Sequence, residues 1–317
     1  MRVLVTGCAG FVGSHLSEAL VARGHEVIGI DCFTDYYARE RKEDNLRRLR
    51  FEPRFTLHEA DLATADLAPL VAGIDLVYHQ AGQPGVRASW GENFATYTVN
   101  NVLATQRLLE ALKGRPLKKF VYASSSSIYG DAEAYPTTET TLPRPVSPYG
   151  VTKLSAEQLV YLYWRNFGLP TISLRYFTVY GPRQRPDMAF HRFIRAILEG
   201  RPIQVFGDGE QTRDFTYIGD IVAANLAAGK CDAAGVALNI GGGSRVSVNQ
   251  VLAVLARHLD RPLHVRYSGT EHGDVRHTSA DTSLAAELLG YAPQVSLERG
   301  LAAEAAWVEQ TALVAAR

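Results

Sequence analysis

The sequence predicts an α/β protein in which helices cover both faces of a parallel sheet and a smaller lobe follows toward the C-terminus. Short apolar strands alternate with helical stretches up to about residue 175, and this alternation indicates a doubly wound parallel sheet. Beyond Tyr176 the glycines and prolines become more frequent and the elements shorter. We therefore expect residues 1–175, with a strand and a helix from about residues 213–240, to form the sheet domain. Residues 176–317 should form mainly the lobe.

The strands are expected at residues 3–6, 26–30, 54–59, 76–79, 119–123 and 171–175. Helices are expected directly after the first strand and over residues 94–113 and 148–167, which carry broad apolar faces. From Leu301 onward the apolar stretch is interrupted by Glu304 and Glu309, which predicts an amphipathic helix on the surface.

The composition excludes several classes of function. The chain has 317 residues with 33 basic and 33 acidic side chains, so its net charge of zero offers no attraction to nucleic acid or to an anionic membrane. Its three cysteines, Cys8, Cys32 and Cys231, are odd in number and lack metal-ligand spacing, which is typical of the reducing cytoplasm. No apolar run approaches the ~20 residues of a membrane span. The first strand begins so early that we expect no signal peptide.

The first strand ends in a glycine turn with the spacing G-x-x-G-x-x-G. Gly7 permits the sharp turn, Gly10 lets a pyrophosphate approach the backbone, and Gly13 lets the next helix pack closely on the sheet. The free N–H groups at the start of that helix then face the phosphates. Asp31 ends the second strand, where it is expected to hold the ribose of NAD and to repel the extra phosphate of NADP. A turn without a ligand is the alternative, but strand, helix and acid together indicate a Rossmann-type site. The expected contacts here are Gly7, Gly10, Phe11, Val12, Gly13 and Asp31.

A second motif, Tyr149-x-x-x-Lys153, lies at the start of the helix expected over residues 148–167. Residues at this spacing share a helix face, so Lys153 and a positive nicotinamide are expected to lower the phenol pKa of Tyr149 from its usual ~10. The phenolate can then accept a proton from a substrate hydroxyl as hydride leaves the same carbon. A serine from residues 124–127 would orient that oxygen, and we expect Ser125 to do so. A surface tyrosine beside a solvated lysine is the alternative, but the glycine turn in the same chain favours catalysis.

The chain resembles the extended short-chain dehydrogenase/reductase family, which remodels nucleotide sugars, over nearly its whole length. Besides the motifs above, the resemblance rests on Asp61-Leu62, His79-Gln80-Ala81-Gly82, Asn100-Asn101 and residues 175–182. The resemblance implies NAD as the cofactor, with Asp61 and Leu62 beside the adenine and with Ala81, Gly82 and Asn100 along the cofactor channel. It also implies UDP contacts from Arg213 and from Asp274 or Arg276, and sugar contacts from Gln83 and Arg87.

Two segments favour one reaction within that family. Its dehydratases and decarboxylases carry an acidic residue where this chain has Ser126 and Ser127, so the chemistry of the lyases is not expected. Residues 175–189 resemble the UDP-glucuronate 4-epimerases, including Thr178 and the run that begins at Arg185. A guanidinium at Arg185 would match the C5 carboxylate of glucuronate as a two-pronged donor. A surface or phosphate-side position for Arg185 is the alternative. The expected substrate contacts are Arg87, Ser125, Ser126, Ser127, Thr178, Arg185, Arg213, Asp274 and Arg276.

We therefore expect NAD-dependent epimerisation of UDP-glucuronate at C4 through a transient 4-keto sugar, giving UDP-galacturonate. The alternatives are an epimerase of UDP-glucose or a UDP-N-acetylhexosamine, a nucleotide-sugar lyase, a simple dehydrogenase and a non-catalytic NAD-binding protein. The family resemblance also implies a homodimer in which the two long helices meet their copies as a four-helix bundle. The apolar residues expected on these helices are Leu103, Leu108, Leu109, Leu159, Leu162 and Tyr163.

Overall fold

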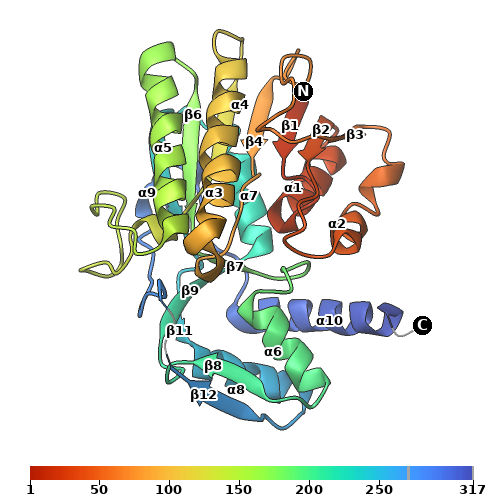
Figure 1. The fold of residues 1–317 in the computed structure, drawn as a ribbon, viewed down its shortest axis with the longest axis vertical. Coiled ribbons are helices and arrows are strands. Elements are labelled where there is room, and N and C mark those ends of the chain that lie inside the picture. The colour runs from red at the N-terminus through yellow and green to blue at the C-terminus, as the bar shows by residue number, and fades with distance from the viewer. Residues whose placement is uncertain (270–271, 316–317) are drawn as a thin grey trace.

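The central sheet is parallel throughout and has seven strands in the order β3–β2–β1–β4–β5–β6–β10 (Figure 1). The computed structural model describes residues 1–269 and 272–315. The strands of the sheet are β1 (Arg2–Thr6), β2 (Glu26–Asp31), β3 (Phe55–Glu59), β4 (Leu76–His79), β5 (Lys119–Ser125), β6 (Thr171–Tyr176) and β10 (Val236–Ile240). The predicted doubly wound sheet is confirmed. Its last strand, β10, comes from the second half of the chain and pairs in parallel with β6.

Helices cover both faces of the sheet because alternate strand residues point to opposite sides. On one face, Val3 and Val5 of β1 share an apolar cluster with Leu16 of α1 and Ile221 of α7. On the other face, Leu4 lies in a separate cluster with Leu108 of α4. The helices of the sheet domain are α1 (Phe11–Ala22), α2 (Arg39–Asn45), α3 (Phe94–Tyr97), α4 (Ala104–Leu112), α5 (Pro148–Phe167), α7 (Ile218–Ala228) and α9 (Ser283–Leu289).

The predicted bounds of α5 are confirmed because its end signals are local. Ser147 caps the helix by accepting a 3.1 Å hydrogen bond from the Gly150 N–H, and Pro148 occupies the first turn. Gly168 ends the helix in the left-handed conformation, with a φ of 69°. The catalytic candidates Tyr149 and Lys153 therefore stand in the first two turns of a helix that is fixed at both ends.

The predicted helical stretch over residues 94–113 is confirmed as far as Leu112, but it contains a π-helical turn that the sequence did not signal. A π-helical segment, Thr98–Leu103, separates α3 from α4. Such an insertion widens the backbone hydrogen-bonding pattern and is frequent at functional sites. Here it contains Asn100 and Asn101, which both line the cavity described below.

The apolar residues of these helices divide between two surfaces. Leu108 and Leu109 are wholly buried and Tyr163 is 5% exposed, so their expected place on a subunit interface is corrected to the sheet. Leu103 and Leu162 remain 44% and 47% exposed. None of the helices that the described residues form combines the length and the apolar character needed to cross a membrane.

The smaller lobe lies beyond the carboxyl ends of the strands, below the sheet in Figure 1. It has a three-stranded sheet, β11–β9–β7, and a two-stranded sheet, β12–β8. Its apolar core includes Phe190, Phe215, Leu255 and Leu301. Its elements are β7 (Thr178–Tyr180), α6 (Ala189–Leu198), β8 (Ile203–Phe206), β9 (Thr212–Tyr217), β11 (Arg245–Ser247), α8 (Val248–Leu259), β12 (Val265–Ser268) and α10 (Leu297–Ala315). Short 3-10 turns occupy Leu49–Phe51, Arg87–Ser89, Gly91–Asn93 and Ser126–Ile128.

The prediction of a surface helix from Leu301 is corrected by α10, which begins at Leu297 and packs one face into this core. Leu301 and Glu304 are both wholly buried. Glu304 accepts a 2.7 Å hydrogen bond from the backbone N–H of Gly181, and its burial raises the pKa of the carboxyl well above its usual range. The glutamate therefore anchors the loop that leads from β7 toward Arg185.

Candidate active site

A cavity of about 420 Å³ runs along the carboxyl ends of the strands, where ligands of such sheets bind. The glycine turn forms one end of it. Gly7 has a φ of 68°, and its N–H donates a 2.7 Å hydrogen bond to the Ile30 carbonyl. A Cβ atom on Gly13 would lie only 2.1 Å from the Gly7 carbonyl oxygen, so α1 packs as closely as predicted from its glycine. The turn and the start of α1 form a cradle open to a ligand. Its lining residues are Gly7, Gly10, Phe11, Val12 and Gly13.

Asp31 stands beside this cradle with both carboxylate oxygens held. It accepts hydrogen bonds of 3.0 Å from the Ala9 N–H and 2.9 Å from the Phe33 N–H. Burial raises the pKa of Asp31, while these N–H groups and the charge of Lys42 oppose that rise. Asp61 and Leu62 line the same cavity. The donor set, the acid and the narrow glycine turn therefore fit a dinucleotide of the NAD type.

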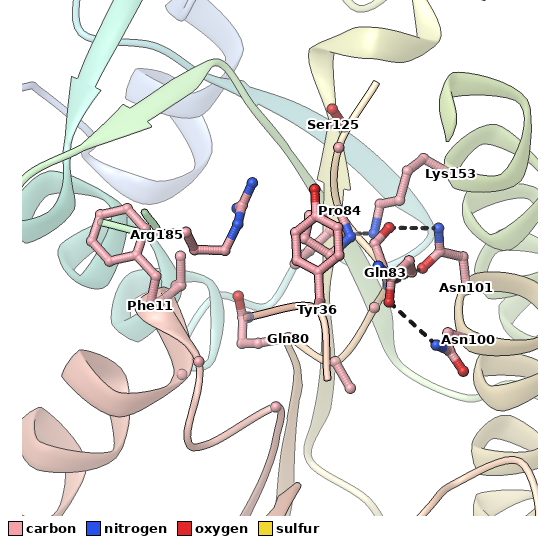
Figure 2. Close-up of a pocket in the computed structure, with 18 of the residues that line it drawn as sticks. Phe11, Tyr36, Gln80, Gln83, Pro84, Asn100, Asn101, Ser125, Lys153 and Arg185 are labelled. Carbon is pink, nitrogen blue, oxygen red and sulfur yellow. Dashed lines mark hydrogen bonds between the residues drawn. The ribbon is translucent and has the colours of Figure 1, made fainter. Parts of the chain in front are cut away.

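The π-helical segment shapes the next part of the wall (Figure 2). Asn101 accepts a 2.6 Å hydrogen bond from the Gln83 N–H and donates to the Gln83 carbonyl at 3.1 Å. Asn100 donates to the Gln83 side chain at 3.4 Å. A Cβ atom on Gly82 would lie 2.9 Å from Asn101 Oδ1. Ala81, Gly82 and Asn100, which the resemblance assigned to the cofactor channel, thus share one wall of the cavity.

His79, at the end of β4, supports this wall through hydrogen bonds with Thr6 and Thr105. Thr105 donates its hydroxyl to the Asn101 carbonyl at 2.6 Å, so its oxygen must accept from His79 Nε2 at 2.9 Å. His79 Nδ1 then accepts from the Thr6 hydroxyl at 2.7 Å. Complete burial lowers the pKa of His79 to about 3. A neutral histidine with its proton on Nε2 therefore ties β1, β4 and α4 together.

The expected catalytic residues Ser125, Tyr149 and Lys153 all line the same cavity. Lys153 Nζ donates a 2.5 Å hydrogen bond to the Ala123 carbonyl of β5. Burial lowers the pKa of Lys153 to about 7, opposed by the charge of Glu157. Ser125 accepts a 3.1 Å hydrogen bond from the Ser127 N–H and so caps the turn at residues 126–128. Strand β5 and helix α5 together bring the three side chains to one place.

The protein's own groups do not provide the expected lowering of the Tyr149 pKa. Burial raises it, while a hydrogen bond with Ser125 and the charge of Arg185 lower it. Desolvation of the phenolate therefore outweighs the stabilising groups that the protein itself provides. The expectation relied on a positive nicotinamide as well as on Lys153, and that charge belongs to the cofactor.

A buried charged group behind these residues was not anticipated from the sequence. Ser124 donates a 2.5 Å hydrogen bond to Glu157, and Arg175 pairs with the same carboxylate at 2.7 Å. Glu157 follows Lys153 by four residues on α5, a spacing that could have signalled a contact. Arg175 also donates to the Tyr129 hydroxyl at 2.6 Å. The network joins the end of β5 to α5 and β6.

The substrate-side candidates Ser126, Ser127, Thr178 and Arg185 line the cavity as well. Arg185 comes from the loop between β7 and α6, and its side chain is only 18% exposed. In Figure 2, Arg185 and Phe11 lie on one side of the view, and Lys153, Asn100 and Asn101 lie on the other. Two partners of Arg185 were missed. Asp187 pairs with it, and Tyr36 donates a 3.3 Å hydrogen bond to Asp187.

Three of the four remaining candidates form a second group beyond this cavity. Arg87 donates to Asp274 at 2.6 Å, and its guanidinium lies 4.1 Å from the ring centre of Phe206, an aromatic contact that the sequence did not signal. Burial lowers the pKa of Arg213, while the charge of Asp274 opposes that shift. Arg87, Arg213 and Asp274 are thus brought together.

Arg276 differs from that group. It pairs with Asp208 through two hydrogen bonds of 3.0 and 2.8 Å, and both side chains are about half exposed. Its guanidinium is therefore engaged at the surface by a carboxylate that the sequence analysis did not consider.

Comparison with known proteins places this site in a family. Residues 3–241 match the NAD dependent epimerase/dehydratase family. The chain is similar to a crystal structure of UDP-glucuronic acid 4-epimerase from Bacillus cereus in complex with UDP-glucuronic acid and NAD. The two share 45% identity and a TM-score of 0.96, with 98% of this chain and 100% of that chain covered.

Two sequence relatives cover the chain equally well. A Bacillus subtilis protein named as an uncharacterised UDP-glucose epimerase, YtcB, is 47% identical over 97% of this chain and 98% of its own. The UDP-glucuronate 4-epimerase of Thermodesulfobacterium geofontis is 39% identical over 97% and 96%. The predicted resemblance and the expectation of NAD as the cofactor are confirmed. The chain belongs to the NAD dependent epimerase/dehydratase family.

Proposed function

We propose that this enzyme interconverts UDP-glucuronate and UDP-galacturonate by epimerisation at C4. The observation that carries the proposal is the position of Arg185, a largely buried guanidinium in the same cavity as Tyr149, whose pKa its charge lowers. A cation so close to the base suits a sugar that carries a carboxylate next to the reacting carbon. The names of the relatives from Bacillus cereus and Thermodesulfobacterium geofontis support the same substrate.

The residues proposed to hold NAD are the glycine turn, Asp31 at the ribose, Asp61 and Leu62 at the adenine, and Ala81, Gly82 and Asn100 along the channel. Held by these residues, the nicotinamide would supply reversible hydride transfer at C4 of the sugar. The backbone N–H groups at the start of α1 would meet the pyrophosphate. The fixed carboxylate of Asp31 would accept from the ribose hydroxyls.

Tyr149 is proposed as the base that takes the proton of the C4 hydroxyl and returns it. Ser125 is proposed to stabilise the phenolate, since its side chain lowers the pKa of Tyr149. Lys153, which donates to the Ala123 carbonyl, is proposed to place its positive charge near the phenol oxygen of Tyr149. The Glu157 network ties β5 to α5, the helix that carries this lysine.

The carboxylate of glucuronate creates a hazard that an epimerase must avoid. Removal of hydride from C4 makes a β-keto acid. Such an acid loses CO₂ when the bond between C5 and the carboxylate carbon stands perpendicular to the plane of the C4 ketone. We propose that Arg185, with the hydroxyls of Ser126, Ser127 and Thr178, holds the carboxylate away from that angle. These four residues share the cavity with Tyr149.

UDP-glucose is the second candidate substrate. The Bacillus subtilis relative is named for it. A lyase is less well supported, because Ser126 and Ser127 occupy the positions where the resemblance implies an acid in dehydratases. Direct comparison of the two sugars therefore decides the substrate.

The test is proton NMR of UDP-glucuronate or UDP-glucose mixed with the purified enzyme, without added NAD and then with it. We expect the galacturonate anomeric signal to grow from UDP-glucuronate, with no change in product mass. Faster conversion of UDP-glucose would replace the acidic-sugar proposal by the neutral one. Loss of 18 or 44 mass units would instead identify a dehydratase or a decarboxylase. Stoichiometric consumption of NAD would identify a dehydrogenase.

We also propose that the enzyme works as a homodimer in the cytoplasm. The support for the dimer is the exposed apolar side chains of α5 and of the segment 94–103, Leu103 and Leu162 among them. The support for the compartment is that Cys8, Cys32 and Cys231 are all free thiols.

A further inference from the structure

Arg185 has a carboxylate partner of its own within the same loop. Its Nε donates to Asp187 Oδ1 and its Nη2 donates to Asp187 Oδ2, both at 3.0 Å. Such a paired contact fixes the plane of a guanidinium as well as its position. Arg185 therefore carries a defined orientation before any substrate arrives.

Asp187 stands behind the guanidinium rather than in front of it. Arg185 and Met188 line the cavity, whereas Asp187 is not among the described residues that do so. The pair uses the edge of the guanidinium formed by Nε and Nη2, which leaves Nη1 outside it. The charge of Arg185 reaches the catalytic base, since it lowers the pKa of Tyr149. The edge away from Asp187 is thus available to a ligand in the cavity.

Asp187 is itself held by the other domain. Tyr36 lies in the segment after β2, five residues beyond Asp31, and donates a 3.3 Å hydrogen bond to Asp187 Oδ2. The Arg185 guanidinium lies 5.9 Å from the centre of the Tyr36 ring (Figure 2). A chain of contacts therefore runs from the cofactor domain through Tyr36 and Asp187 to the cavity.

We propose, resting on the function proposed above, that Asp187 is a positioning residue that gives the enzyme its preference for acidic sugars. Asp187 fixes the orientation of the Arg185 guanidinium so that the edge not bonded to Asp187 faces the C5 carboxylate of the sugar. Tyr36 keeps Asp187 in position through its hydrogen bond. An unfixed arginine would lose much side-chain freedom on gripping the substrate, and that loss opposes binding. A neutral sugar makes no ion pair with Arg185, so its binding does not depend on this arrangement.

The test is the Asp187→Asn variant, which keeps the size and one acceptor oxygen but removes the charge. We expect the Kd of UDP-glucuronate, measured by calorimetry with NAD-loaded enzyme, to rise about tenfold, the equivalent of about 1.4 kcal/mol. The Kd of UDP and of UDP-glucose should stay unchanged. In turnover, KM for UDP-glucuronate should rise while kcat changes little. Tyr36→Phe should produce a smaller loss in the same direction.

A double variant and a control variant test whether Asp187 affects UDP-glucuronate binding only through Arg185. Adding Asp187→Asn to Arg185→Ala should cause no further loss of UDP-glucuronate affinity, because the residue acts through the arginine. Glu199→Gln is the matched control, since Glu199 pairs with Arg195 and Arg201 on the surface of the same lobe. It should leave all three affinities as in the wild type.

Tighter binding of UDP-glucuronate by Asp187→Asn would overturn the proposal, because it would mean that Asp187 competes with the substrate for Arg185. Unchanged binding, or equal losses for all three ligands, would overturn it as well. Failure of the proposed function gives a different result. In that case the wild type itself would not epimerise UDP-glucuronate, whereas the positioning role fails when the wild type does so and Asp187→Asn gives any of the three results just named.

Discussion

Ser124 donates its hydroxyl to the Glu157 carboxylate at 2.5 Å, and this contact ties strand β5 to α5, the helix that carries Tyr149. Ser124 precedes Ser125 at the end of β5, and Glu157 lies one turn beyond Lys153 on α5. The Glu157 carboxylate also forms an ion pair with Arg175, with Nη2 2.7 Å from Oε1. Removing one member of a buried ion pair is strongly destabilising, so the separation of β5 and α5 is held firmly. The proposed catalytic arrangement thus depends on a buried network behind Ser125, Tyr149 and Lys153.

The first prediction concerns the base. Tyr149→Phe should reduce turnover by several orders of magnitude, because only the proton acceptor is lost. NAD affinity should remain nearly intact, since the ring still packs edge to face on Tyr97, with ring centres 6.2 Å apart. Steady-state rates and a fluorescence titration with NAD measure the two effects. Tyr161→Phe, an exposed tyrosine on the same helix, is the control, and turnover of Tyr149→Phe within about tenfold of wild type would remove Tyr149 from the mechanism.

The second prediction is a pH dependence of stability due to His79. Its pKa is about 3 in the folded protein and about 6.5 when unfolded. The unfolded chain therefore binds the proton more readily between these values. The contribution of His79 to stability is complete above about pH 6.5 and declines as the pH falls toward 3, by at most ~1.4 kcal/mol per pH unit.

Urea unfolding from pH 7.5 to 4.5 measures this dependence. His79→Gln should flatten it, whereas His258→Gln, an exposed histidine on α8, should not. Nitrogen-15 NMR of the ring should show a neutral imidazole protonated on Nε2 at pH 5. An imidazolium signal at that pH would contradict the hydrogen-bond assignment through Thr6 and Thr105.

Parts of this architecture were predictable because their signals are local. Both ends of α5 are marked in the sequence itself by Ser147, Pro148 and Gly168. The spacing of the glycines likewise predicts the turn after β1, where Gly7 has a positive φ. The π-helical segment at Thr98–Leu103 was missed because one widened turn hardly changes an apolar pattern.

Other features depend on partners distant in the chain. The burial of Glu304 depends on where the loop at Gly181 passes, and this is a tertiary contact that spacing does not reveal. Asp187 acquires a role only through Arg185 and Tyr36, which come from different domains. Many of the residues that line the cavity could therefore be predicted, but much of the network that supports them could not.

The third prediction tests the homodimer. Leu103 and Leu162 stay 44% and 47% exposed on the segment 94–103 and on α5, as the interface of a four-helix bundle requires. Light scattering at micromolar concentration should give the mass of a dimer. Leu103→Glu combined with Leu162→Glu should shift it to a monomer, because two charges would be buried without partners. Phe51→Glu, on an exposed phenylalanine outside both helices, should leave it dimeric; a monomeric wild type would contradict the prediction.

The last prediction tests Arg185 against the substrate carboxylate. Arg185→Ala or Arg185→His should weaken UDP-glucuronate far more than UDP, because loss of a charge-assisted paired contact costs about 2–4 kcal/mol, a factor of roughly 30 to 1000. The freed carboxylate should reach the perpendicular angle more often, so the 4-keto sugar should lose CO₂. A mass spectrum with UDP-glucuronate as sole substrate should then contain a UDP-4-keto-pentose or UDP-pentose that the wild type does not release. Arg192→Ala, an exposed arginine of α6, is the control. If Arg185→Ala keeps full affinity and yields only the epimer, Arg185 does not hold the carboxylate.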